Sequence, residues 1–289
     1  MVRHRLFGCG VATLALIGAR PVYSGPINFT GVVANDFLDT DRGVHKITLT
    51  DNPRDIGQAD FITARNWVSG WSVQDVRFSY DQNTDTLFVG FNTFKNQNGQ
   101  YAIIGDVDGD GDPGRAAPET LAAGGTDQPN LGGRESVALG IAPDGPNQGP
   151  GKLVAVAGIS ADKSASGPGL IGFNVAKPRS DTLGLGNNFG ETLTDNLGEL
   201  AFNPSAEHPG FEFTIKNFSK LEGVDPYRGF WVTAYAGAPD DFVVGETGLR
   251  LTRVPALAEQ VIPEPATILA WSIVAGGSVL GLRGRRSRR

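Results

Sequence analysis

The sequence predicts an all-β protein, in which residues 25–257 form a single antiparallel β-sandwich of the jelly-roll kind. Forty glycines and 18 prolines among 289 residues indicate many turns between short elements. Short apolar runs alternate with clusters of Gly, Pro, Asn and Asp, and no helical periodicity extends beyond two turns between residues 27 and 257. Many short strands without intervening helices are typical of a β-sandwich.

Hydrophobic alternation and turn residues place the strands. We expect a hairpin formed by Val76–Tyr80 and Thr86–Phe94 around the polar loop 81–85. Phe211–Lys216 shows the cleanest alternation in the chain, which predicts one face on a core and the other in water. Further strands are expected at Tyr101–Gly105, Glu135–Ile141, Lys152–Ile159, Leu170–Val175, Gly229–Tyr235 and Leu249–Val254.

The charge is distributed unevenly between the body and the two ends. Eight of the 25 basic residues but only one of the 31 acidic residues lie in positions 1–24 and 264–289, which leaves 17 basic against 30 acidic side chains between them. An acidic body repels nucleic acid and attracts cations, so we expect no nucleic-acid partner. Cys9 is the only cysteine, so no disulfide can form within the chain.

Residues 1–24 have the three parts of a secretory signal peptide. Arg3 and Arg5 give a positive start, Leu6–Ala19 is apolar, and small residues offer cleavage after Ala19 or after Ser24. We therefore expect export and processing by a signal peptidase.

The other end predicts a membrane helix with the body outside. A linker, residues 258–262, leads to the triplet Pro263-Glu264-Pro265 and the apolar run Ala266–Leu282. This run is at the low limit of the length that spans a bilayer. The arginines that follow at 283–289, among them Arg283, Arg285 and Arg286, would stay cytoplasmic and stop translocation.

The triplet, the apolar run and the terminal arginines resemble, in that order, the PEP-CTERM sorting signal. The resemblance covers residues 263–289 alone. It implies recognition by an exosortase, removal of the tail near the triplet, and delivery to the cell envelope or extracellular matrix of a host that makes exopolysaccharide. A plain membrane anchor with an incidental Pro-Glu-Pro is the alternative interpretation.

One loop carries a metal-binding pattern. Asp106-Val107-Asp108-Gly109-Asp110-Gly111-Asp112 places a carboxylate at every second position of a segment that can turn sharply at Gly111. Calcium takes roughly six to eight oxygen ligands at short range. The spacing resembles the first half of an EF-hand loop, and it predicts a structural calcium ion with Asp106, Asp108, Asp110 and Asp112 as ligands. The competing interpretation is a solvated acidic turn.

The loop departs from the EF-hand at its last ligand. The bidentate Glu of the EF-hand would fall at Ala117, which cannot bind a cation. We expect Glu135, at the start of the next predicted strand, to supply this carboxylate, with Glu119 and Asp127 as alternatives.

No pattern indicates an enzyme. His45 and His208 are the only histidines outside the signal segment, and neither stands in a nucleophile motif. The loose candidates for a glycosidase carboxylate pair are Asp36, Asp39, Asp41, Asp240 and Asp241.

The body allows three functions, of which the third, a glycoside hydrolase, would need two of these carboxyl groups in one groove. The first is an exported structural or adhesive protein with a calcium-stabilised sandwich. The second is a carbohydrate-binding module for exopolysaccharide, in which Trp67, Trp71 and Trp231 would form a face that stacks on sugars. The segment Trp71–Gly105 also looks like the first hairpin of extracellular domains related to DOMON and family-9 carbohydrate-binding modules, which supports the fold and leaves the ligand open.

Overall fold

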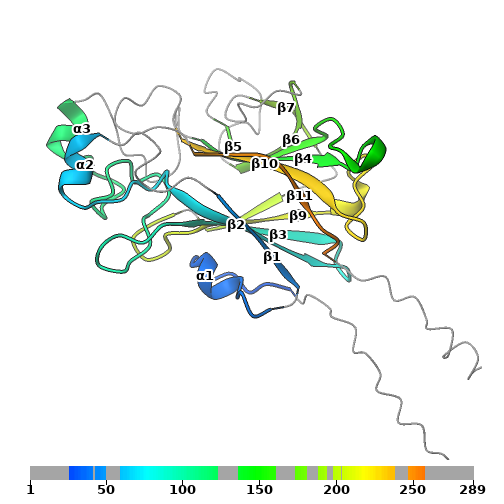
Figure 1. The fold of residues 1–289 in the computed structure, drawn as a ribbon, viewed down its shortest axis with the longest axis horizontal. Helices are drawn as coiled ribbons and strands as arrows, with labels where there is room; N and C mark the ends of the chain where they lie inside the picture. Colours follow the sequence, from blue (N-terminus) through cyan, green and yellow to red (C-terminus); the bar gives the residue numbers. More distant parts are fainter. Residues whose placement is uncertain are drawn as a thin grey trace, which may run out of the picture.

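The computed structural model describes residues 26–41, 43–49, 59–122, 136–160, 173–180, 188–193, 198–202, 204–237 and 247–257. Within them the chain forms two antiparallel sheets and a few short helices (Figure 1), so the all-β expectation is confirmed. The predicted signal peptide, linker and sorting tail lie outside the described residues, as do Asp127 and Glu135. The part of the chain that is described holds no helix both long and apolar enough to cross a bilayer.

The first sheet has five strands in the order β1-β2-β3-β9-β8. Their bounds are Val44–Thr48 (β1), Val73–Asp81 (β2), Thr86–Thr93 (β3), Gly198–Phe202 (β8) and Phe211–Lys216 (β9). The predicted hairpin is confirmed as β2 and β3, which pair from Val73↔Thr93 to Asp81↔Thr86 around the expected loop. The predicted strand Phe211–Lys216 is confirmed at both ends as β9.

The second sheet has six strands in the order β11-β10-β4-β5-β6-β7. Their bounds are Ser136–Pro143 (β4), Ala155–Ile159 (β5), Phe173–Pro178 (β6), Phe189–Thr192 (β7), Phe230–Gly237 (β10) and Thr247–Val254 (β11). The runs β1-β2-β3 and β4-β5-β6-β7 are meanders within one sheet, and the chain changes sheet from β3 to β4, from β7 to β8 and from β9 to β10.

The two sheets pack face to face around one apolar core. Phe78 of β2 meets Phe230 of β10 edge-on, with ring centroids 6.4 Å apart. Leu139 of β4 and Phe213 of β9 are also fully buried in this core, and Trp71, just before β2, is 0% exposed. Each such side chain contributes about 1.5–3 kcal/mol of burial free energy.

The helices are short and lie outside the two layers. They are α1 (Val33–Asp36), α2 (Asp60–Ala64), α3 (Pro118–Ala122) and the 3-10 turns η1 (Pro146–Gln148) and η3 (Phe218–Lys220). Figure 1 shows α1 against the outer face of the five-stranded sheet, and α2 beside α3 at one end of the sandwich.

The strand predicted at Tyr101–Gly105 is wrong. Tyr101 makes one isolated bridge with Lys95, after which Ala102 N donates to Phe94 O and Ile104 N donates to Pro209 O. The backbone donors of this apolar run therefore bind separate segments instead of one partner strand. Conversely β1, β7 and β8, each four or five residues long, are strands that the sequence pattern did not predict.

The outer face of β9 lies in water only at its far end, where Lys216 is exposed and Thr214 is half-buried. Glu212, the second residue of β9, is 0% exposed because the chain around α1 covers it. Gly90, the partner of Glu212 on β3, permits the close approach: a Cβ there would lie 2.7 Å from Val33 Cγ1 and 2.8 Å from Phe37 Cε2.

Among the described strands four lie at sheet edges, of which β7, β8 and β11 pair irregularly with their neighbours while β1 pairs regularly and carries a lysine. Lys46 lies on β1, and β11 is irregularly paired with β10 between Val232 and Ala234. β8 carries Glu199 and is shifted in register against β9, and the four-residue β7 is shifted against β6.

Candidate metal centre

The Asp-rich loop is fixed in place by close backbone contacts with residues 68–70. Gly70 N donates to Asp106 O at 2.7 Å, and Asp106 N donates to Ile103 O at 2.9 Å. Gly109 has φ +72°, and a Cβ there would lie only 2.1 Å from Val68 O. Gly111, the expected bend, has φ +93° but faces open space. The close approach that requires glycine is therefore at Gly109.

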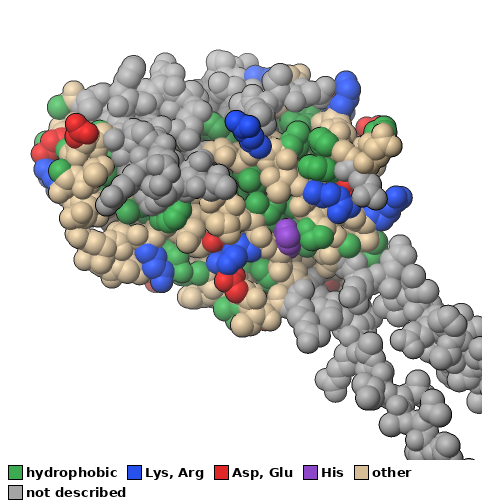
Figure 2. All heavy atoms as spheres, viewed as in Figure 1, with side chains coloured by type: hydrophobic (Ala, Val, Ile, Leu, Met, Phe, Trp, Pro, Cys, Tyr) green, Lys and Arg blue, Asp and Glu red, His purple; other side chains and the backbone are tan. Residues whose placement is uncertain are grey.

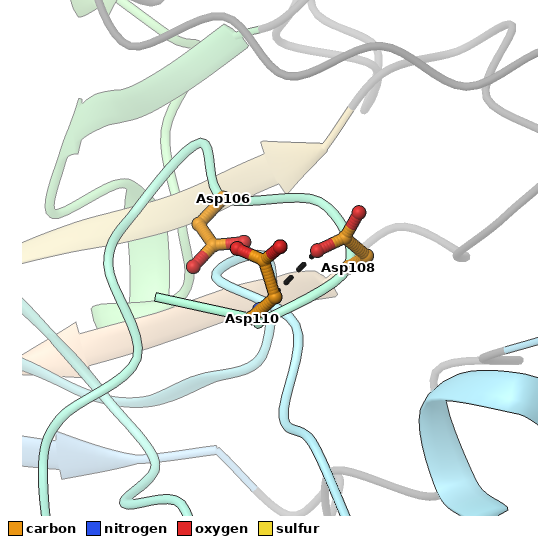
Figure 3. A group of neighbouring side chains, drawn as sticks. All are labelled: Asp106, Asp108 and Asp110. Carbon is orange, nitrogen blue, oxygen red and sulfur yellow. Dashed lines mark hydrogen bonds between the residues drawn. The ribbon is translucent and has the colours of Figure 1, made fainter. Parts of the chain in front are cut away.

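Three of the predicted ligands come together. Asp106, Asp108 and Asp110 each offer one carboxylate oxygen, and these three oxygens lie within 4.8 Å of one another (Figure 3). Asp106 is 1% exposed and Asp108 is 0% exposed, whereas Asp110 reaches the surface. Calcium–oxygen distances are about 2.3–2.6 Å, so oxygens at this spacing can bind one ion between them.

Backbone donors hold the Asp106 carboxylate from both sides. Its Oδ1 accepts from Gly109 N at 2.7 Å and its Oδ2 accepts from Gly111 N at 2.9 Å. Burial first, and then the charges of Asp108 and Asp110, nevertheless raise the pKa of Asp106 to about 7 against the effect of the two donors. A bound cation would offset both the burial cost and this repulsion.

Asp108 joins the loop to helix α3. Its Oδ2 accepts from Ala117 N at 2.8 Å and from Thr120 Oγ1 at 2.6 Å, and its Oδ1 accepts from Asp110 N at 3.2 Å. Ala117 stands where an EF-hand has its last ligand, and here its backbone N–H binds the Asp108 side chain instead. Sequence reasoning missed Thr120. No pattern within the loop points to a hydroxyl 12 positions after Asp108.

The structure does not bring Asp112 or Glu119 into this group. Asp112 is exposed, its N donates to Asp110 Oδ1 at 2.7 Å, and its own Oδ1 accepts from Gly114 N at 3.3 Å. Glu119 forms a two-pronged ion pair with Arg65, which lowers the pKa of this carboxyl. Glu135, the expected additional ligand, lies outside the described residues.

The end of the sandwich that holds the loop is acidic at its surface. Figure 2 shows acidic side chains gathered at the end that carries α2 and α3. Arg65, which follows α2, sits 4.7 Å from the ring centroid of Trp67, and its pKa is raised first by Glu119 and then by the charges of Asp108 and Asp110. A cation approaching this end therefore meets a field that favours it.

The three tryptophans proposed for sugar stacking lie in different surroundings. Trp71 is completely buried, so its ring cannot contact a glycan in this structure. Trp67 is half-buried beside the core, under Arg65. Trp231 is half-buried on the outer face of the six-stranded sheet, where its Nε1 donates to Asp144 Oδ1 at 2.9 Å. They do not form one face.

The residues weighed for catalysis have structural contacts. His45 is half-buried on β1, and burial lowers its pKa. The ring of His208 packs 4.8 Å from that of Phe202. Asp39 pairs with Lys46 at 2.7 Å. Asp36 belongs to the cover of the five-stranded sheet, and Asp240 and Asp241 lie outside the described residues.

Protein-family models, curated proteins and solved structures were compared with the chain, and none matched it. Function is therefore inferred from the residues of this chain.

Proposed function

We propose that this protein is an exported structural or adhesive β-sandwich, stabilised by one calcium ion in the loop 106–112 and sorted to the cell envelope or matrix. The observation that carries the proposal is the cluster of Asp106, Asp108 and Asp110, with three oxygens within 4.8 Å in a loop locked by Gly109. Two of these carboxylates are buried, where unpaired negative charge is costly.

The donor set favours a hard cation. All three ligands are carboxylates, and neither His nor Cys belongs to the group, which disfavours zinc and copper. Magnesium requires near-octahedral geometry and keeps several waters, whereas calcium accepts the irregular arrangement of a loop. The bound ion would neutralise the carboxylates, and Glu135 is the residue we propose as a further ligand.

A structural role fits the position of the loop. It binds residues 68–70 on one side and α3 on the other, so an ion there would connect segments that no disulfide joins. The glycan-binding alternative has less support, because Trp71 is buried and Trp67 and Trp231 lie on separate surfaces.

Thermal unfolding of the full chain in mild detergent, with calcium or with chelator, tests the metal site. At calcium a hundredfold above Kd, the free energy of unfolding should rise by about 2.7 kcal/mol. Glu135→Gln should reduce this gain, and Glu119→Gln is the matched control that should keep it because Glu119 binds Arg65. Equal midpoints with and without calcium would exclude the proposed site.

Mass analysis of the native protein tests the proposed sorting. We expect the mature chain to begin near Arg20 or Gly25 and to end close to Pro263-Glu264-Pro265. Deletion of residues 283–289 should impair retention and processing and leave the body folded, because these arginines set the stop-transfer. A full-length cytosolic species in the native host would contradict export.

A further inference from the structure

Residues 26–37, here named the N-terminal strap, cover the outer face of the five-stranded sheet. Its Phe29 ring lies 5.6 Å from that of Phe88 on β3 and 6.1 Å from that of Phe37, while Val33 and Phe37 are buried against the same strand. Figure 1 shows α1, which is part of the strap, on the side of this sheet away from the other layer. The strap thus closes an otherwise open sheet face.

Only a few polar contacts attach the strap to the sheet. Gly210 N donates to Gly31 O at 2.8 Å, and Gly31 N donates to Glu212 Oε2 at 2.8 Å. At the far end of the strap, Arg77 Nη1 donates to Phe37 O. Glu212 is therefore the one carboxyl group of the sheet that binds the strap backbone among the described residues.

The Glu212 carboxyl group faces a second carboxyl group. Its Oε1 is buried, and no donor from the described residues reaches it. Two consecutive amides of the strap bring the two carboxyl groups together, because Thr30 N donates to Asp36 Oδ2 at 2.6 Å and Gly31 N donates to Glu212 Oε2 at 2.8 Å. Both oxygens of Asp36 already accept bonds, from Thr30 N at 2.6 Å and Thr30 Oγ1 at 2.7 Å. Two carboxyl groups can bond to each other only when one of them keeps its proton.

No cation among the described residues binds this pair. The partners of Glu212 on the adjacent strands are Gly90 and Phe202, which carry no charge. Arg77 stands beyond Gly90 in the same row, but its guanidinium binds Asp75 at 2.6 Å and Asp39 at 3.2 Å. His208, on the segment before β9, contacts Gly31 and Phe202. Burial first, and then Asp36, raise the pKa of Glu212 to about 9.

We propose that a proton shared by Glu212 and Asp36 holds the N-terminal strap on the sheet, and that loss of this proton releases the strap. Release would uncover the outer face of β3 and β9 while the core between the sheets stays packed. The device is independent of the calcium site.

The sign of the pH dependence follows from linkage. In the released state Glu212 is solvated and has its ordinary pKa of 4.5, whereas in the closed state the pKa is about 9. Below the ordinary value both states are protonated, so the closed strap keeps its full stability. Between the two values only the closed state holds the proton, and the opening constant should rise about tenfold for each pH unit.

Hydrogen exchange of the full chain in mild detergent with calcium present, at pH 6 and pH 8, measures strap opening. After correction for the intrinsic exchange rate, protection of residues 26–37 should fall about a hundredfold between the two pH values. Protection of β2 and β5 should not change. Equal strap protection at both pH values would overturn the proposal.

Two variants and a control distinguish the effect of the shared proton from the effect of packing alone. Glu212→Gln has the shape of the protonated side chain, so its strap protection should be independent of pH. Asp36→Asn removes the facing charge and should shrink the dependence, which keeps the test available if the first variant does not fold. Glu199→Gln, an exposed acid on the adjacent β8, is the control that should behave as wild type. If strap protection in the Glu212→Gln variant depended on pH as it does in wild type, the proposed role of the shared proton would be refuted.

Discussion

The Asp-rich loop and the N-terminal strap both bury carboxyl groups, and they handle the charge in opposite ways. In the loop, Asp106 and Asp108 together accept five backbone and side-chain bonds from residues close in sequence. Under the strap, Glu212 accepts one backbone bond and faces Asp36. The donors in the loop offset only part of the burial cost, since the pKa of Asp106 is still raised to about 7, and a cation can supply the rest. Under the strap, with one donor and a facing carboxyl group, a proton is the counter-charge.

Among the variants, we expect the largest loss in the free energy of unfolding from a substitution at Gly109, which fixes the loop against residues 68–70. Gly109→Ala would place a Cβ 2.1 Å from Val68 O at φ +72°, so residues 68–70 or the loop must move. We expect a loss of about 4 kcal/mol in the free energy of unfolding, measured with urea. Gly111→Ala is the matched control: its φ is also positive but its Cβ meets nothing, and the loss should be about 1 kcal/mol.

The second test compares the two buried acids directly. Asp108→Ala leaves Ala117 N and Thr120 Oγ1 without their acceptor, which should cost about 3 kcal/mol in chelator and remove the response to calcium. Glu212→Gln should instead leave stability at pH 8 unchanged or higher, because folding at that pH no longer has to take up a proton that the unfolded Glu212 does not hold. Urea unfolding at pH 8 measures both. Similar losses of stability in the two variants would show that the two sites do not differ in how they accommodate a buried carboxyl group.

The third test overpacks the strap without touching the loop. Gly90→Ala would bring a Cβ to 2.7 Å from Val33 Cγ1 and 2.8 Å from Phe37 Cε2, whose side chains can shift. We expect a loss of about 2 kcal/mol, seen as faster hydrogen exchange of residues 26–37. The calcium-induced rise in melting temperature should be that of wild type. A changed calcium response would mean that the strap and the loop are coupled.

The smallest effect is expected at Asp112. It is exposed and lies outside the group of three carboxylates, so Asp112→Asn should change stability in chelator by less than about 0.5 kcal/mol. Most of the stabilisation by calcium should remain. Loss of that stabilisation in a calcium titration would make Asp112 a ligand and enlarge the site beyond Asp106, Asp108 and Asp110.

The carboxylate contacts of the loop are local in sequence and the contact of Glu212 with the strap is distant, and this difference explains which parts of the molecule could be predicted. The loop was found from seven consecutive residues, because alternating Asp and Gly report local geometry directly. The hairpin β2–β3 and strand β9 were found because their apolar alternation extends over six or more residues. β7 and β8 are too short for a pattern to stand out.

What was missed depends on contacts between distant segments. Glu212 reads as a solvent-facing residue in its own strand, and the glycine that covers it lies 181 positions away. Tyr101–Gly105 has the composition of a strand, but its backbone donors bind residues 94 and 209 on different segments. The lock at Gly109 likewise depends on Val68, which no pattern within the loop indicates.

The four edge strands have a consequence for crowded surroundings. An open, regular edge is a template onto which another chain can add a strand, and it leads to aggregation. Here β1 and β8 carry Lys46 and Glu199 at their edges, β8 and β11 are irregularly paired, and β7 has four residues. We therefore expect neighbouring copies to gain little from joining their sheets along these edges.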